Sequence, residues 1–289
     1  MIHPIFNNIL KKLSVVFGII CFITSGLSSR EVASEATISI CSWNLKDFGR
    51  SKSDVEIAFI ANTIKDFDIV IIQEVVAGDP AGAQAVGRLG EALNRTGAKW
   101  EYRVSDATSG INSYKRERYA FLWKPSKARL VGKPWLERQY EMEIDREPFF
   151  ATFAVSNDSF TLVNFHAITK SMQPETEIKY FKYLPAEYPT LNLLFCGDFN
   201  VPQSHSVFIP LRKMGYTSAF VNEKTSLKMT CVDSDCLASE FDNIYFNSSR
   251  LIKIEAGVIP FYTGFNDFEE ARLVSDHLPI FLKFRITIE

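Results

Sequence analysis

The chain has 289 residues, of which 46% are hydrophobic and 23% are charged, and its 32 basic and 34 acidic side chains give a formal net charge of −2. This composition excludes a disordered tail, a collagen-like fibre and a multi-span membrane protein, because apolar residues sufficient for a core are interrupted by charge. It also argues against a polybasic nucleic-acid binder, so phosphate must be handled by a few placed side chains or bound cations.

The first 28 residues have the order of a secretory signal peptide. Lys11 and Lys12 precede an apolar run over residues 13–27, which is shorter than the ~20 residues a spanning helix needs. Small residues lie at the end of this run and after it, so a signal peptide is favoured over a retained anchor. Cleavage after Ser28 is favoured over cleavage after Ala36, which lies at the edge of the first expected strand. We therefore expect a secreted or periplasmic protein without stable membrane association after cleavage.

Strand-like and helix-like segments alternate along the rest of the chain. The expected strands are Thr37–Trp43, Asp68–Val75, Trp100–Val104, Arg118–Lys124, Pro148–Val155, Ser159–His166, Leu191–Cys196, Asp242–Phe246, Leu251–Val258 and Leu278–Ile286. The expected helices are Ser53–Phe67, Gly82–Arg95 and Glu175–Leu184. Ser53 and Glu56 have the spacing of a capping box. This order predicts one α/β domain with more than one sheet.

The mature chain contains a close pair of cysteines, Cys231 and Cys236, set among serine and aspartate residues. In an exported protein this spacing predicts a small disulfide loop rather than free thiols. Cys41 and Cys196 lie in apolar runs, and we expect them to be buried as small hydrophobic residues.

Polar residues interrupt the apolar strands at their ends. They are Asn44, Glu74, His166, Asp198, Asn200, Asp242, Asp276 and His277. Ligands of α/β proteins collect at strand ends, so these side chains could converge on one cleft. Each alone also has a structural explanation as a turn, a cap or a hydrogen-bonded residue. Of the four histidines, only His166 and His277 stand at strand ends.

As a set, these segments resemble the signature segments of the endonuclease/exonuclease/phosphatase superfamily. The segments are SWNLKDFG (42–49), IIQEV (71–75), NSYKRERYAF (112–121), DREPFFATF (145–153), NFHA (164–167), GDFN (197–200), FDNIYF (241–246) and SDHLP (275–279). The third and fourth look most like the secreted, deoxyribonuclease I-like branch. The resemblance implies an α/β fold of two packed mixed β-sheets flanked by helices, an α/β/β/α sandwich, in a single catalytic domain over residues 29–289.

The resemblance also implies a hydrolytic centre with two histidines. His166 would pair with Asp242, and His277 with Glu117, so that each carboxylate orients an imidazole. One pair would act as general base and the other as general acid, and the sequence leaves open which does which.

Further residues would bind a cation and the phosphate. Glu74, Asn44 and Asp276 would hold a divalent cation, and oxygen ligands suit Mg²⁺, or alternatively Mn²⁺ or Ca²⁺, and argue against zinc. Asp198 and Asn200 would position the phosphate and complete the catalytic group.

Two residues of the same segments would contact the substrate phosphates. Tyr114 would touch the scissile phosphate, although one extra residue separates it from Glu117. Arg146 would bind a flanking phosphate, and its alternative is a salt bridge to Asp145 or Glu147.

The leading hypothesis is an exported, divalent-metal-dependent endonuclease that hydrolyses DNA phosphodiester bonds with little sequence preference, mainly through contacts with backbone phosphates. No obligatory protein partner is inferred. The main alternative is a phospholipid or inositol-phosphate phosphodiesterase or phosphatase of the same fold. Two others are a toxin-type nuclease subunit and a binding module with a relic site.

Overall fold

The computed structural model describes residues 36–78, 80–110 and 116–287. The expected signal peptide over residues 1–28, and Tyr114, lie outside these ranges. Among the described residues, no helix has both the length and the apolar character needed to cross a bilayer.

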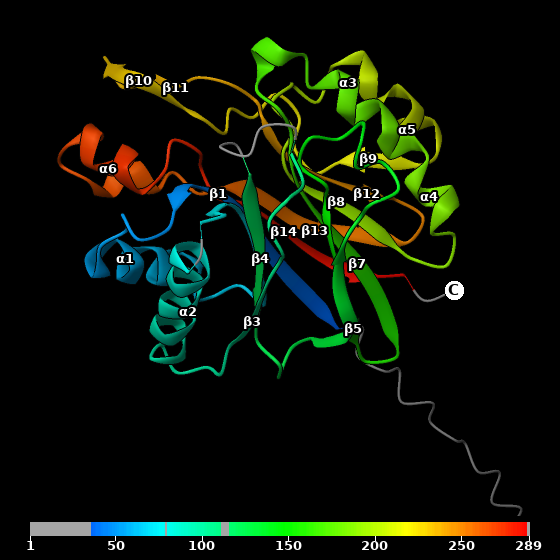
Figure 1. Ribbon diagram of the computed structural model, residues 1–289, viewed down its shortest axis with the longest axis horizontal. Helices are drawn as coiled ribbons and strands as arrows, with labels where there is room; N and C mark the ends of the chain where they lie inside the picture. Colours follow the sequence, from blue (N-terminus) through cyan, green and yellow to red (C-terminus); the bar gives the residue numbers. More distant parts are fainter. Residues whose placement is uncertain (1–35, 79, 111–115, 288–289) are drawn as a thin grey trace, which may run out of the picture. The chain divides into compact units, whose positions relative to one another are not determined.

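Two mixed six-stranded β-sheets carry the fold (Figure 1). The first has the order β13 (Leu251–Val258), β14 (Ile280–Ile286), β1 (Thr37–Phe48), β2 (Ile69–Val76), β4 (Glu117–Trp123) and β3 (Glu101–Val104). The second has the order β5 (Arg129–Leu136), β6 (Phe149–Val155), β7 (Asp158–His166), β8 (Leu193–Asp198), β12 (Asp242–Asn247) and β9 (Tyr216–Ser218). β1 and β2 are parallel, as are β7 and β8.

The alternation of side chains along the strands separates three buried layers. On β1, Ile38 and Ile40 face the second sheet, whereas Cys41 and Trp43 face the helices on the outer side. On β8, Phe195 packs against the outer helices of the second sheet. The expected α/β/β/α sandwich of two mixed sheets is therefore confirmed.

Six helices contribute to these layers or join them. They are α1 (Asp54–Ile64), α2 (Ala81–Asn94), α3 (Glu175–Ile178), α4 (Leu184–Glu187), α5 (Ile209–Lys213) and α6 (Phe268–Val274), among the described residues. Figure 1 shows α1 and α2 on the side of the first sheet and α3, α4 and α5 on the side of the second. The capping box is confirmed, because Ser53 and Glu56 exchange side-chain to backbone hydrogen bonds.

The predicted helix Glu175–Leu184 is wrong in its continuity. A 3₁₀ turn over Lys179–Lys182 separates α3 from α4. Pro185, in the first turn of α4, lacks the N–H that a continuous helix would need there.

Several short elements were not expected from the sequence. The edge strand β5 is largely exposed, and the hairpin of β10 (Leu227–Val232) and β11 (Asp235–Leu237) lies outside both sheets. The Cys231–Cys236 disulfide closes this hairpin, which confirms the predicted pairing. Cys41 and Cys196 are buried free thiols, as expected.

Gly197 places the end of β8 directly against β7. Its φ is +133°, and a Cβ at this position would lie 2.0 Å from the Phe165 carbonyl oxygen. We expect Gly197→Ala to lower the free energy of unfolding by at least about 2 kcal/mol, because the backbone of β7 would have to move. Urea denaturation measures this, with Gly264→Ala as the control because nothing lies within 4 Å of its Cβ position. Equal effects of the two substitutions would contradict the close-approach argument.

Candidate active site

The polar strand ends meet at one edge of the sandwich. In the second sheet, the pairing register places His166 beside Asp198, and Asp198 beside Asp242, on three adjacent strands. In the first sheet, β4 runs antiparallel to β2, so Glu117 at its start lies at the same edge as Glu74 near the end of β2. The topology therefore brings together residues that are far apart in the sequence.

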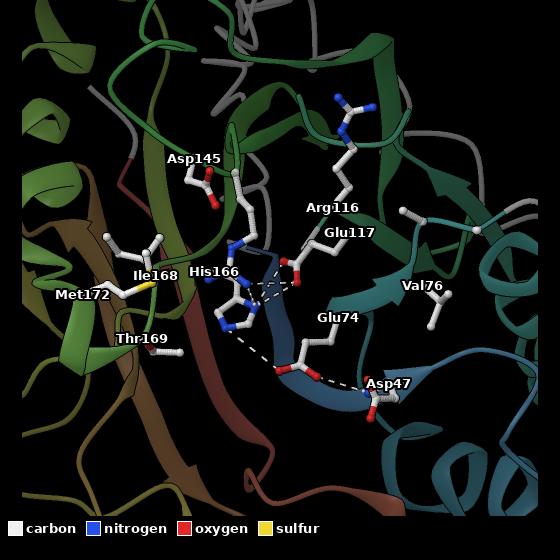
Figure 2. Close-up of a pocket in the computed structure, with 13 residues that line it drawn as sticks. Asp47, Glu74, Val76, Arg116, Glu117, Asp145, His166, Ile168, Thr169 and Met172 are labelled. Carbon is white, nitrogen blue, oxygen red and sulfur yellow. Dashed lines mark hydrogen bonds and ion pairs between the residues drawn. The ribbon is translucent and has the colours of Figure 1, made fainter. Parts of the chain in front are cut away.

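The first histidine–carboxylate pair is His166 with Glu117 (Figure 2). The Nδ1 atom of His166 lies 3.1 and 3.0 Å from the two carboxylate oxygens of Glu117. The Tyr119 hydroxyl accepts a hydrogen bond from the His166 backbone N–H at 3.2 Å and donates to the Arg146 carbonyl at 3.3 Å. Both members of the pair are buried, so the imidazole is held in one orientation with Nε2 directed away from Glu117.

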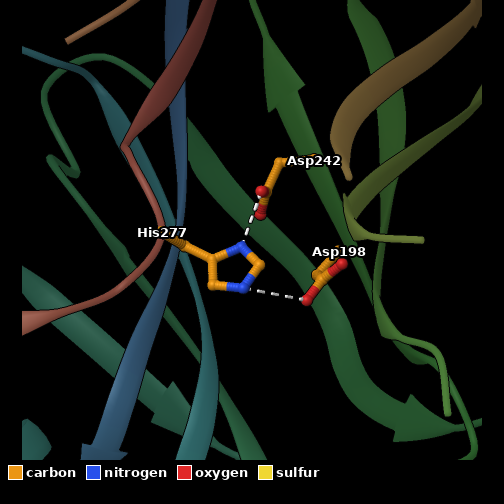
Figure 3. A group of neighbouring side chains, drawn as sticks. All are labelled: Asp198, Asp242 and His277. Carbon is orange, nitrogen blue, oxygen red and sulfur yellow. Dashed lines mark hydrogen bonds and ion pairs between the residues drawn. The ribbon is translucent and has the colours of Figure 1, made fainter. Parts of the chain in front are cut away.

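The second pair is His277 with Asp242 (Figure 3). The Nδ1 atom of His277 lies 2.7 Å from Asp242 Oδ2, and the Thr225 hydroxyl donates to the same oxygen at 2.7 Å. The Ser275 hydroxyl accepts from the His277 backbone N–H at 2.9 Å. This imidazole is also fixed through its Nδ1 side.

Asp198 lies between the two imidazoles. Its Oδ2 atom is 3.5 Å from His166 Nε2 and 3.6 Å from His277 Nε2. The same oxygen accepts from Asn44 Nδ2 at 3.1 Å, and Oδ1 accepts from the Asn200 backbone N–H at 2.9 Å. The free edges of both imidazoles thus converge on one point, where a reacting group could be placed between a base and an acid.

The pairing inferred from the resemblance is therefore wrong, although all four residues are present. His166 and Asp242 belong to the same sheet and are separated by β8, so their strands lie about 10 Å apart. The segment of His277 leads into β14, which two strands separate from β4 and Glu117, a distance of about 14 Å between strands. Each histidine instead reaches across the sandwich to a carboxylate of the other sheet.

Burial gives the two imidazoles different pKa values. Burial, and then the Arg146 guanidinium, lower the pKa of His166 to about 4. Burial also lowers the pKa of His277, but the Asp242 and Asp198 carboxylates outweigh it and raise that pKa to about 10. Burial raises the pKa of Glu117 to about 7. At neutral pH the site therefore contains one neutral and one charged imidazole.

Arg146 does not reach outward as a phosphate-binding side chain would. Its Nη1 lies 3.3 Å from Glu117 Oε2 and 3.2 Å from His166 Nδ1, and Nη2 donates to the Ala167 carbonyl. The side chain is only 12% exposed. Arg146 does form a salt bridge, as the alternative prediction had it, but its partner is Glu117 rather than Asp145 or Glu147.

Two of the three expected cation ligands have oxygen atoms suited to a metal. The Oδ1 atom of Asn44 is buried without a hydrogen-bond partner, so it needs a donor or a cation. Glu74 has a positive φ of 59° at an irregularity of β2, a backbone conformation that costs energy in a non-glycine residue and clusters at functional sites. Its carboxylate lies 4.0 Å from His166 Nε2 and accepts from the Asp47 backbone N–H at 3.1 Å. Asp276, in contrast, forms an ion pair with Arg272 at 3.4 Å.

A second group could also hold a metal ion. The ligand atoms of Asp198, Asp242 and His277 all lie within 4.8 Å of one another. Asp242 and His277 already satisfy each other through their short hydrogen bond. Glu74 and the unpartnered Oδ1 of Asn44, in contrast, supply oxygen atoms of the kind that divalent cations prefer.

A cavity of about 400 Å³ opens beside the first pair (Figure 2). Glu74, Glu117 and His166 line it on the polar side, and Val76 and Met172 are among its apolar lining residues. Its size falls in the usual range for small-ligand sites.

Sequence reasoning missed the residues that orient the two pairs. Thr225 and Tyr119 bond to Asp242 and to the His166 backbone from segments where neither interrupts an apolar strand. Glu177, whose carboxylate accepts hydrogen bonds from two backbone amides near Arg146, lies on a short helix. Only their position in the fold identifies them.

Comparison with known proteins identifies the family of this chain. The model of the Endonuclease/Exonuclease/phosphatase family matches residues 41–277. A deoxyribonuclease of Thioalkalivibrio sp. (strain K90mix) is 29% identical over 273 residues, covering 87% of this chain and 72% of its own length. Human deoxyribonuclease gamma is 28% identical over 288 residues, covering 88% of each chain.

The fold is also found among solved structures. A mannosyl-6-phosphatase of Bacteroides thetaiotaomicron superposes with a TM-score of 0.62 at 19% identity, covering 87% of this chain and all of its own. The matched family segment contains both histidine–carboxylate pairs. The chain therefore belongs to the endonuclease/exonuclease/phosphatase family and is, as expected, a phosphoester hydrolase.

Proposed function

We propose that the protein is an exported, divalent-metal-dependent endonuclease that hydrolyses DNA phosphodiester bonds with little sequence preference. The observation that carries this proposal is the convergence of two histidine–carboxylate pairs on Asp198. Hydrolysis of a phosphodiester needs one group to take a proton from water and another to give a proton to the leaving oxygen. A site with one neutral and one positively charged imidazole supplies both.

His166 is assigned as the general base and His277 as the general acid. The neutral imidazole of His166 accepts a proton from water at Nε2, while Glu117 orients the ring through Nδ1. The water oxygen bonds to phosphorus and the bond from phosphorus to the leaving oxygen breaks. His277, charged at neutral pH, gives its Nε2 proton to that oxygen, and Asp242 stabilises the charged form before the transfer.

Glu74 and Asn44 are the residues that would hold the cation. Bound Mg²⁺ or Mn²⁺ would neutralise negative charge on a non-bridging phosphate oxygen. The oxygen-only donor set and the unpartnered Asn44 Oδ1 support this choice. Asn200 and Asp198 would position the substrate phosphate beside the cation. Arg146 contacts the Glu117–His166 pair and does not bind a flanking phosphate.

The choice of DNA rests on the relatives. Both curated relatives described above are named deoxyribonucleases and align over most of this chain. The superposed phosphatase is too distant to indicate more than the fold. The Cys231–Cys236 disulfide supports export to an oxidising compartment, secreted or periplasmic.

Plasmid nicking tests the substrate. Purified mature protein with Mg²⁺ is expected to nick supercoiled plasmid and to leave sphingomyelin, inositol phosphates and mannose 6-phosphate intact. His166→Ala protein is the control for contaminating nuclease. An intact plasmid together with turnover of a lipid or sugar phosphate would move the protein to the phosphatase or phospholipase alternative.

The pH dependence tests the assignment of acid and base. We expect kcat to fall below about pH 7, where the Glu117–His166 pair takes up a proton, and above about pH 10, where His277 loses its own. The Asp242→Asn substitution removes the carboxylate that contributes most to raising the His277 pKa. The fall of kcat at high pH, which is the alkaline limb of the pH–rate profile, should therefore move to lower pH. Initial rates across this range measure both limbs. An alkaline limb that does not respond to the substitution would exclude His277 as the acid.

A further inference from the structure

Glu177 is a buried carboxylate beside the site that the proposed reaction does not use. It lies on α3 and is only 3% exposed. Its Oε1 atom accepts a hydrogen bond from the Asp145 backbone N–H at 2.7 Å, and Oε2 accepts from the Ile168 backbone N–H at 2.9 Å. A charged group is seldom buried unless it is fully hydrogen-bonded, so these two contacts account for its place in the interior.

The two amides belong to segments on either side of the first catalytic pair. Asp145 immediately precedes Arg146, whose guanidinium contacts Glu117 and His166. Ile168 follows Ala167, whose carbonyl accepts from the same guanidinium. Glu177 therefore fixes the backbone next to Arg146 and also the backbone next to Ala167, whose carbonyl accepts from the Arg146 guanidinium. The two segments that hold the guanidinium are thus tied to one carboxylate.

We propose that Glu177 is a positioning residue for catalysis, which acts by holding the Asp145 and Ile168 amides and thereby keeps the Arg146 guanidinium against the Glu117–His166 pair. The hydroxyl of Tyr119 fixes the same segment through the Arg146 carbonyl, so backbone and side chain of Arg146 are held from two directions. Figure 2 shows Asp145 on one side of His166 and Glu117 on the other.

A carboxylate is required at this position because both of its hydrogen-bond partners are backbone N–H groups, so both side-chain oxygens must act as acceptors. In Glu177→Gln the side chain keeps its size but replaces one acceptor oxygen with an NH₂ group, which faces a backbone N–H. One of the two segments must then shift. Residues that orient catalytic groups typically cost 10–100-fold when altered, and we expect a loss of that size in kcat. KM should change less than about threefold, because Glu177 does not itself line the cavity.

Hydrolysis of bis(4-nitrophenyl) phosphate and of plasmid by the full protein measures the effect. Glu175→Gln is the matched control, since it makes the same chemical change on the same helix at a residue that is only partly buried. It should leave kcat within about twofold. Thermal unfolding of each protein separates lost activity from lost fold.

A double-mutant cycle with Arg146→Ala distinguishes positioning from general structural support. If Glu177 acts through Arg146, Glu177→Gln costs less than about threefold in the Arg146→Ala background. An equal loss in both backgrounds, or an unchanged kcat in the single variant, would overturn the proposal. If Glu177→Gln does not fold, Glu177→Asp, which keeps the charge but reaches only one amide, is used in the same cycle.

This inference rests on the proposed hydrolytic function, but the two can fail separately. If the wild type cleaves neither plasmid nor bis(4-nitrophenyl) phosphate, the proposed function fails. If the wild type cleaves them and the Glu177 substitutions behave like Glu175→Gln, only the positioning role fails.

Discussion

Replacement of either His166 or His277 with alanine is expected to lower kcat for DNA hydrolysis by ~10²–10⁴-fold, the usual loss for a general acid or base. Each imidazole has one nitrogen bonded to a carboxylate and the other directed at Asp198. These Nε2 atoms are therefore the ring nitrogens left to exchange protons with a substrate beside Asp198. Initial rates on plasmid at saturating Mg²⁺ measure the loss.

The fold should survive both substitutions, so the effect is chemical. Glu117 keeps its ion pair with Arg146 when His166 is removed, and Asp242 keeps its hydrogen bond from Thr225 when His277 is removed. His205→Ala is the control, because His205 lies outside the site. Its imidazole has a local contact, in which Nδ1 accepts a hydrogen bond from the Val207 backbone N–H. A near-wild-type rate in either active-site variant would refute the mechanism.

The double variant adds a second criterion. Residues that act together in one step lose activity non-additively, so His166→Ala with His277→Ala should be scarcely slower than the slower single variant. Losses that multiply fully would instead mean that the two imidazoles act in independent steps.

The site residues at the strand ends were predictable from the sequence, because polar residues that interrupt apolar runs are rare and seldom have a purely structural role. His166, Asp198 and Asp242 each interrupt such a run, and the structure places them side by side. The pairing of the histidines was not predictable. It depends on which sheet each strand joins, and strand order is a property of the whole chain rather than of any segment.

The short elements and the supporting residues were missed for related reasons. β5 is an exposed edge strand, so no alternation of apolar and polar residues marks it. Glu177 stands on a short helix and reads as a solvent-facing residue, yet the fold buries it against two backbone amides. Such roles depend on long-range contacts that a local pattern does not encode.

Removal of divalent cations is expected to have an effect as large as loss of a histidine. In excess EDTA, hydrolysis should fall by at least ~10³-fold, since a cation on the phosphate contributes several kcal/mol of transition-state stabilisation. Addition of Mg²⁺ or Mn²⁺ should restore it, because carboxylate and amide oxygens prefer these ions. Recovery with Zn²⁺ alone would overturn the assignment of oxygen ligands.

The ligands themselves are tested by the cation concentration that gives half-maximal rate. Glu74→Gln should raise this Mg²⁺ concentration ~10–100-fold, because it removes the only charged oxygen of the Glu74–Asn44 pair. Asp276→Asn is the matched control: Asp276 is bound to Arg272, so the Mg²⁺ requirement should stay within about twofold. If Asp276→Asn raised the requirement as much as Glu74→Gln, the three-ligand set expected from the sequence would be correct and the Arg272 ion pair would have to open when the cation binds.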